Sequence, residues 1–332
     1  MSISAEMKAS GHKGIDALVA YLDKNKPIVV QAHDFPDFDA VAAGYALCEL
    51  LQDRGIHADL CYSGRIESNS LIEAIRSLEI PIVESSTLHL TEATQIILVD
   101  GFIGNRNVTD LPGEVVALID HHKPPEQPNV PYWDIRMDYG STSTIVWSYF
   151  DIAEVAVSHN CATCLLMGLM MDTAFMTRGV HKVDLAAFSA LFFQGDWEFG
   201  SRILKNSLSL MDLAVFREAI NSCEMVNDFC FIPVHKECSP EVAALVADFF
   251  LNLREVHFAV VLVPDQEEYR ISVRSKDLGK PADVVIRQTL KGIGSGGGHV
   301  HMGGGQIPID LFPGEQALRQ RFIDALATLA NK

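Results

Sequence analysis

The stretch VVALIDHH, residues 115–122, is the most informative part of the sequence because it joins the pattern of a strand to a carboxylate and two imidazoles. Its first five residues form an apolar run that is typical of a parallel strand buried on both faces. Open α/β sheets bind their ligands outside the carboxyl ends of such strands. Asp120, His121 and His122 therefore fall where a ligand site is expected.

Two other apolar runs end in the same way. Residues 27–32 (PIVVQA) lead into 33–39 (HDFPDFD), and residues 95–99 (QIILV) lead into Asp100. Imidazoles with several carboxylates suit borderline-hard divalent ions such as Mn²⁺, with Mg²⁺, Fe²⁺ or Co²⁺ as alternatives. The sequence therefore predicts a divalent metal site. The side chains at the three strand ends are His33, Asp37, Asp39, Asp100, Asp120, His121 and His122.

Each motif also has a structural interpretation when it is taken alone. The first motif could be a capped loop with Asp39 as the N-cap of the next helix. His121 and His122 could be ordinary loop residues. Asp172 follows the apolar run 167–171, where a buried carboxylate needs a partner and a cation is the strongest one. Because histidine and aspartate residues follow three separate strands, the metal site is favoured over these structural interpretations.

Strand and helix patterns alternate along the chain, which predicts an α/β fold with a doubly wound, mostly parallel sheet. We expect this catalytic domain to span residues 1–194. A helical connector over 195–224 would lead to a smaller α/β domain over 225–332. The substrate would lie in a cleft between the two domains.

The composition restricts the partners. The formal net charge of the 332-residue chain is −17, and proteins that track long nucleic acids usually carry a basic face. We therefore expect no long nucleic acid, whereas a short anionic substrate is compatible because bound metal ions supply positive charge. No apolar stretch approaches the ~20 residues that span a membrane, so no membrane partner is expected.

The seven cysteines are scattered. Their odd number and the absence of a secretory signal pattern predict a cytoplasmic protein with reduced thiols. Cys161 and Cys164 form a CxxC pair inside an apolar helical run, and they are interpreted as buried helix residues rather than a zinc or redox site.

The glycine-rich segment 292–299 (GIGSGGGH) contains a GxGxxG match. A dinucleotide fingerprint must follow a strand and open a helix. This segment follows a helical pattern and precedes Pro308, so we reject that interpretation. A flexible surface loop is one alternative, and the preferred one is a backbone-amide cradle for a phosphate.

Together the motifs resemble the DHH phosphoesterase superfamily. Residues 33–40 are similar to its first motif, Asp100 to its second and Asp120-His121-His122 to its third. The resemblance continues, in the family's order, through the segment 140–144 (GSTST), the fourth motif at 171–175 (MDTAF) and the GGGH of the DHH-associated C-terminal domain at 296–299. The most similar branch contains oligoribonucleases (nanoRNases), phosphoadenosine-phosphate phosphatases and exopolyphosphatase-like proteins.

The resemblance implies roles for the matching residues. It implies two metal ions, with Mn²⁺ expected and Mg²⁺ or Co²⁺ as alternatives, and Asp100 as the ligand that they share. The implied metal ligands are His33, Asp37, Asp39, Asp100, His121 and Asp172. The implied catalytic group is His122 beside the phosphoryl group, Asp120 as its orienting partner, and Asp100. The implied substrate-binding residues are Arg274, Ser275, Gly296, Gly297, Gly298 and His299.

The implied activity is hydrolysis of short oligoribonucleotides or 3′-phosphoadenosine 5′-phosphate to mononucleotides. The alternatives are a polyphosphate or pyrophosphate phosphohydrolase and a non-catalytic nucleotide sensor. The resemblance to the family also implies a homodimer. Phe38 between the two aspartates of the first motif, and Ala42-Ala43 after it, depart from many relatives, and these departures bear on substrate preference.

Overall fold

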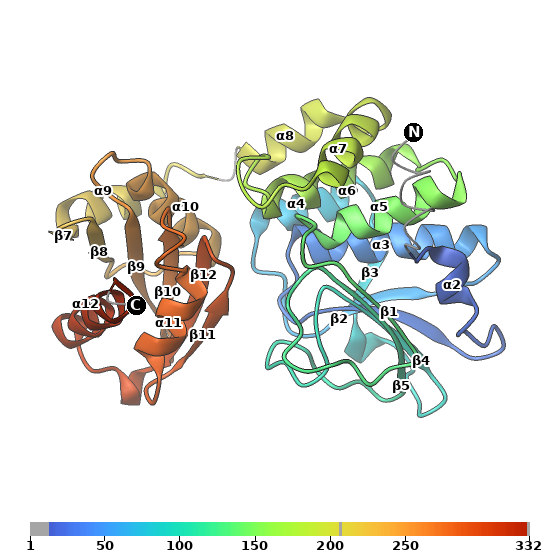
Figure 1. Ribbon diagram of the computed structural model, residues 1–332, viewed down its shortest axis with the longest axis horizontal. Helices are drawn as coiled ribbons and strands as arrows, with labels where there is room; N and C mark the ends of the chain where they lie inside the picture. Colours follow the sequence, from blue (N-terminus) through green and yellow to red (C-terminus); the bar gives the residue numbers. More distant parts are fainter. Residues whose placement is uncertain (1–12, 206–207, 331–332) are drawn as a thin grey trace. The chain divides into compact units, whose positions relative to one another are not determined.

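The computed structural model describes residues 13–205 and 208–330, and the chain divides into two compact units, Met1–Ser207 and Leu208–Lys332. The segment expected as a helical connector is divided between them. Helix α8 (Trp197–Lys205) belongs to the first unit and α9 (Leu213–Ser222) to the second (Figure 1).

The first unit contains a six-stranded sheet in which every neighbouring pair is parallel. The strands are β1 (Ile28–Ala32), β2 (Asp59–Tyr62), β3 (Ile82–Glu84), β4 (Gln95–Val99), β5 (Glu114–Asp120) and β6 (Tyr132–Ile135). This confirms the predicted α/β class. The order β3-β2-β1-β4-β5-β6 changes direction between β1 and β4, and such a switch point is where open α/β sheets bind ligands.

The helices of the first unit share one large core with one face of this sheet (Figure 1). They are α2 (Ile15–Val19), α3 (Phe38–Asp53), α4 (Asn69–Ser77), α5 (Thr142–Ala153), α6 (His159–Asp172), α7 (Lys182–Gln194) and α8. Loop residues cover the opposite face: Phe102 and Val108 pack against Leu98 and Leu118. The connections after β4 and β5 reach the next strand without a helix.

Helix α6 runs through the core. Its ten buried residues, Cys161 to Met170, include Cys161 and Cys164, which confirms their interpretation as buried helix residues. The helix ends at Asp172, so its packing fixes where that carboxylate lies. Among residues 13–205 and 208–330, no helix combines the length and apolar character that crossing a membrane requires.

The second unit contains a mixed sheet in the order β11-β12-β10-β9-β8-β7, in which β8 and β9 are parallel. Its strands are β7 (Glu224–Val226), β8 (Phe229–Pro233), β9 (Phe258–Asp265), β10 (Glu268–Ser275), β11 (Ser295–Gly298) and β12 (Met302–Pro308). Helices α9 and α10 (Pro240–Leu251) pack on one face. Helices α11 (Ala282–Leu290) and α12 (Glu315–Ala330) pack on the other.

The glycine-rich segment forms a strand over Ser295–Gly298, so the alternative of a flexible surface loop was wrong, and the phosphate cradle stays a prediction. Glycines of β11 pair with glycines of β12, for example Gly296 with Gly305 and Gly297 with Gly304. A Cβ on Gly296 would lie 3.1 Å from the Gly304 carbonyl oxygen. Glycine therefore allows this close pairing, which ordinary β-propensity would not have predicted.

Candidate metal centre

The structure places the predicted ligands at the carboxyl ends of three neighbouring strands. His33 follows β1, Asp100 follows β4, and Asp120 is the last residue of β5. Because β4 lies between β1 and β5 in the sheet, Asp100 occupies the middle of this edge. Asp172 reaches the same region from the end of α6, 3.1 Å from His121.

A first cluster forms around His33. Its Nε2 lies 3.9 Å from Asp37 Oδ1 and 3.9 Å from Asp100 Oδ2. The Nδ1–H of His33 donates to the Asp34 carbonyl at 2.7 Å, so Nε2 is the ring atom that could bind a metal ion. Asp37 is the N-cap of α3 and accepts from the Asp39 backbone N–H, so the alternative with Asp39 as the cap was wrong.

A second cluster forms around His121. Its Nε2 lies 3.1 Å from Asp172 Oδ2, 3.8 Å from Asp100 Oδ1 and 4.0 Å from Asp39 Oδ2. The Nδ1–H of His121 donates to the Tyr139 carbonyl at 3.2 Å. This bond orients the ring in the way that metal-binding histidines usually are oriented.

Asp100 faces both clusters. Its Oδ2 points toward His33 and its Oδ1 toward His121. The residue adopts φ of +55°, a left-handed conformation that non-glycine residues seldom adopt and that is typical of functional sites. The Thr142 hydroxyl donates to Oδ1 at 2.9 Å. One buried carboxylate therefore lies between the two clusters, at the position for which the resemblance implies a shared ligand.

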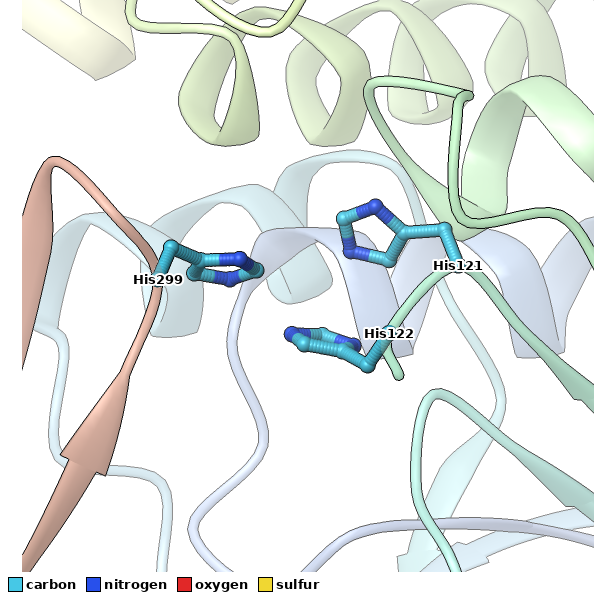
Figure 2. A group of neighbouring side chains, drawn as sticks. All are labelled: His121, His122 and His299. Carbon is cyan, nitrogen blue, oxygen red and sulfur yellow. The ribbon is translucent and has the colours of Figure 1, made fainter. Parts of the chain in front are cut away.

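His122 is held by Asp120. Asp120 is fully buried, and its Oδ1 accepts from the backbone N–H of His122 at 2.6 Å and from its Nδ1–H at 2.8 Å. The rings of His121 and His122 meet edge to face with centroids 4.2 Å apart (Figure 2). Burial lowers the pKa of His122, but its hydrogen bonds to Asp100 and Asp120 raise it to about 12. These two carboxylates therefore favour the protonated form of His122.

Burial and neighbouring groups shift the pKa values of the side chains in this centre. Burial raises the pKa of Asp39 well above its ordinary value, and the charges of Asp172 and Asp100 raise it further. Burial lowers the pKa of His121, but the hydrogen bond to Asp172 raises it to about 9. Burial raises the pKa of Asp100, but the hydrogen bond and charge of His122 bring it below its usual range.

This donor set fits a divalent cation. Crowded, buried carboxylates are costly unless a positive charge compensates them. Oxygen and imidazole ligands suit Mn²⁺, Mg²⁺ or Co²⁺. Ligand atoms of His33, Asp37 and Asp100 lie within 4.8 Å of one another, as do those of Asp39, His121 and Asp172.

Sequence reasoning assigned no role to two residues that hold Asp39. The backbone N–H groups of Thr142 and Ser143 donate to Asp39 at 2.7 and 2.8 Å. These residues open α5 after its N-cap Ser141, so a helix N-terminus also faces the carboxylate. A Cβ on Gly168 of α6 would lie 2.4 Å from Ser143 Oγ, which explains the glycine. The Ser-Thr run 141–144 was the available signal.

The predicted substrate-binding residues lie together at one end of the second unit's sheet. Arg274 pairs with Met302 in the β10–β12 ladder, and its Nε donates to Asp248 Oδ1 at 2.7 Å. Ser275 is buried and its hydroxyl donates to the Lys280 carbonyl, so it shapes a turn. His299 follows β11, and its backbone N–H donates to the Met302 carbonyl. Gly296, Gly297 and Gly298 lie in β11.

Two family models match the chain. The model described as "DHH family, N-terminal domain" matches residues 27–169, and the DHHA1 domain model matches residues 226–331. The first match contains the ligands of the three strand ends. The second contains Arg274, Ser275 and the glycine-rich hairpin.

Curated relatives resemble the chain at low identity. An uncharacterised protein of Methanocaldococcus jannaschii is 25% identical over 308 residues, which cover 92% of this chain and 63% of that protein. A probable manganese-dependent inorganic pyrophosphatase of Streptococcus thermophilus is 28% identical over 169 residues, 49% of this chain and 54% of that protein. The chain thus spans between about half and two thirds of the length of these relatives.

Solved structures share the fold. An exopolyphosphatase-related protein of Bacteroides fragilis superposes with a TM-score of 0.77 at 21% identity, over 95% of this chain and 97% of that one. RecJ of Thermus thermophilus, solved with Mn²⁺, superposes with a TM-score of 0.53 at 16% identity, over 96% of this chain and 54% of that one. With both domain models matched in order, the chain belongs to the DHH family and carries an N-terminal DHH domain followed by a DHHA1 domain.

Proposed function

We propose that this chain is a hydrolase, a metal-dependent phosphoesterase that uses two divalent cations, with Mn²⁺ as the preferred ion. The observation that carries the proposal is the placement of Asp100, with one oxygen toward His33 and the other toward His121. Two cations held side by side activate water and offset the negative charge of a phosphoester under attack.

The residues of this chain would have the following roles. His33, Asp37 and Asp100 would hold one ion, and Asp39, Asp100, His121 and Asp172 would hold the other. Protonated His122 donates its Nε2–H to an oxygen of the phosphoryl group, which lowers the cost of the developing charge. Asp120 keeps the His122 ring in the orientation that this contact needs, because it accepts the Nδ1–H.

For the substrate we propose short oligoribonucleotides, 3′-phosphoadenosine 5′-phosphate, or both, cleaved to mononucleotides. The net charge of −17 supports a short substrate over a long nucleic acid. Arg274 and His299 would bind its terminal phosphate, since guanidinium and imidazolium groups form charge-assisted hydrogen bonds with phosphate oxygens. The cleft between the domains, the homodimer and the cytoplasmic location stay predictions.

A second candidate is a phosphohydrolase of pyrophosphate or polyphosphate. The likeness to the Streptococcus thermophilus pyrophosphatase favours it, because that match covers 49% of this chain. The DHHA1 match over residues 226–331 favours the nucleotide substrate, because its glycine-rich hairpin is the proposed phosphate contact. A nucleotide sensor without turnover is the non-enzymatic alternative.

The test is a substrate panel with the full-length, Mn²⁺-loaded protein. The substrates are a diribonucleotide, 3′-phosphoadenosine 5′-phosphate and tripolyphosphate, with product release followed by chromatography. We expect mononucleotide from one or both of the first two. Turnover of tripolyphosphate alone would select the second candidate, and nucleotide binding without any turnover would select the sensor.

His299→Ala is expected to weaken substrate use without affecting the metal. The loss of one charge-assisted hydrogen bond costs about 1.5–3 kcal/mol, which corresponds to a rise in KM of roughly 10–100-fold. The measurement is KM against kcat, with bound Mn²⁺ determined by elemental analysis. His257→Ala, an exposed histidine before β9, is the control. Loss of metal in His299→Ala would refute the proposed separation of roles.

A further inference from the structure

One short segment contacts three of the proposed metal ligands. This segment, residues 139–143, is called the ligand strap below. Its Tyr139 carbonyl accepts from the His121 ring. The backbone N–H groups of Thr142 and Ser143 donate to Asp39, and the Thr142 hydroxyl donates to Asp100. The orientation of the three ligand side chains therefore depends on where the ligand strap lies.

The start of α7 holds the ligand strap from outside the metal centre. Gly140 N–H donates to Asp184 Oδ2 at 2.9 Å, and the same oxygen accepts from the His181 backbone N–H at 2.7 Å. Asp184 is fully buried. The His181 ring also stacks on Tyr139, with centroids 5.2 Å apart and the planes at 17°. Two consecutive residues of the ligand strap thus contact the start of α7: Tyr139 by ring stacking and Gly140 by a hydrogen bond.

The ligand strap has no room to shift at Gly140. A Cβ there would lie 2.5 Å from Thr173 Cγ2, 3.0 Å from Asp184 Oδ2 and 3.1 Å from the Gly179 carbonyl oxygen. Thr173 directly follows the proposed ligand Asp172 at the end of α6. Close-packed interiors transmit displacements instead of absorbing them. A substitution of Asp184 would therefore shift the positions of the proposed ligand side chains.

We propose that Asp184 is a positioning residue of the metal centre: it holds Gly140 and so fixes the ligand strap against His121, Asp39 and Asp100. The inference rests on the proposed metal site. Asp184 acts on the ligands through the backbone of the ligand strap, because it accepts from Gly140 N–H. Groups that hydrogen-bond to metal ligands typically contribute roughly 10–100-fold to metal affinity, and Asp184 fixes the segment that supplies those groups here.

A purely structural role for Asp184 predicts a different result. Asp184 is also the N3 residue of the α7 capping box, with His181 as the N-cap. Loss of such a cap costs about 1 kcal/mol of stability. A cap alone would lower the melting temperature and leave the Mn²⁺ affinity of the folded protein unchanged.

The experiment compares Mn²⁺ dissociation constants, measured by titration calorimetry, with melting temperatures of the metal-free proteins. Asp184→Ala is expected to weaken Mn²⁺ binding by roughly 10–100-fold. Asp184→Asn keeps an acceptor oxygen for Gly140 N–H and is expected to restore binding to within about 3-fold of wild type. Asp196→Ala is the matched control, because Asp196 accepts from the Phe199 N–H at the start of α8 and does not contact the strap. Asp196→Ala should lower the melting temperature and leave the Mn²⁺ affinity unchanged.

Wild-type Mn²⁺ affinity in folded Asp184→Ala would overturn the inference, as would equal losses of affinity in Asp184→Ala and Asp196→Ala. If Asp184→Ala does not fold, Asp184→Ser replaces it, because the shorter hydroxyl does not reach Gly140 while keeping a polar atom in the site. An unchanged affinity in that variant would equally overturn the inference. A wild-type protein that binds no Mn²⁺ would instead refute the proposed function.

Discussion

Asp100→Ala is expected to abolish phosphoester hydrolysis and to lower the metal content. The substitution removes the carboxylate that faces both clusters. His33 and Asp37 then remain around one ion, too few ligands to hold it. Loss of a single electrostatic contact in an active site costs about 10²–10³-fold in rate, and loss of a shared ligand should cost at least as much. The measurements are kcat/KM and Mn²⁺ bound per chain.

Two further variants make this result specific. Asp110→Ala removes an exposed carboxylate from the same β4–β5 connection, and it should keep wild-type activity and metal content. Asp100→Asn keeps the shape of the side chain but lacks its charge, so it should bind metal more weakly than wild type. Near-normal turnover of Asp100→Ala would show that Asp100 is not the shared ligand.

His122→Ala is expected to lower kcat while the metal content stays at the wild-type level. Asp100 and Asp120 raise the pKa of His122 to about 12, which favours its protonated form. Its side chain is 34% exposed, so it is the accessible proton donor beside the buried ligands. Loss of a positioned acid or hydrogen-bond donor costs about 10²–10⁴-fold. The measurement is kcat together with bound Mn²⁺.

Asp120→Asn separates orientation from proton donation. The amide oxygen can still accept from the His122 backbone or ring, so the loss of kcat should be smaller than in His122→Ala. A His122→Ala variant that lost Mn²⁺ would contradict the assignment, because His122 would then be a ligand. The ligand atoms of His122, Asp100 and Asp120 lie within 4.8 Å of one another, so a ligand role for His122 is the alternative that this measurement tests.

The sequence predicted the central strands because each is buried on both faces. Strands β1, β4 and β5 consist mainly of an apolar run, which is the pattern of a covered parallel strand. The sequence did not predict the edge strands β3 and β6. Both are short, and β6 places exposed Trp133 next to buried Asp134. Such strands owe their conformation to pairing with a neighbour, which leaves no periodic pattern in the chain.

The same limit applies to the site. Its ligands were predictable because they follow recognisable strands or sit in an apolar helix. The ligand strap works mainly through backbone atoms of Tyr139, Gly140 and Ser143, which no side-chain pattern reveals. Asp184 reads in the sequence as an ordinary acidic residue in the first turn of a helix. Only the fold shows that it bonds to Gly140, 44 residues earlier.

The most direct test of the two-metal phosphoesterase is to strip the wild-type protein of metal and return Mn²⁺ stepwise. Hydrolysis is followed with the best of the three panel substrates while bound Mn²⁺ is measured. The account predicts no turnover of the stripped protein and activity that rises until two Mn²⁺ ions are bound per chain. Full turnover in excess chelator, or none with two ions bound, would contradict it.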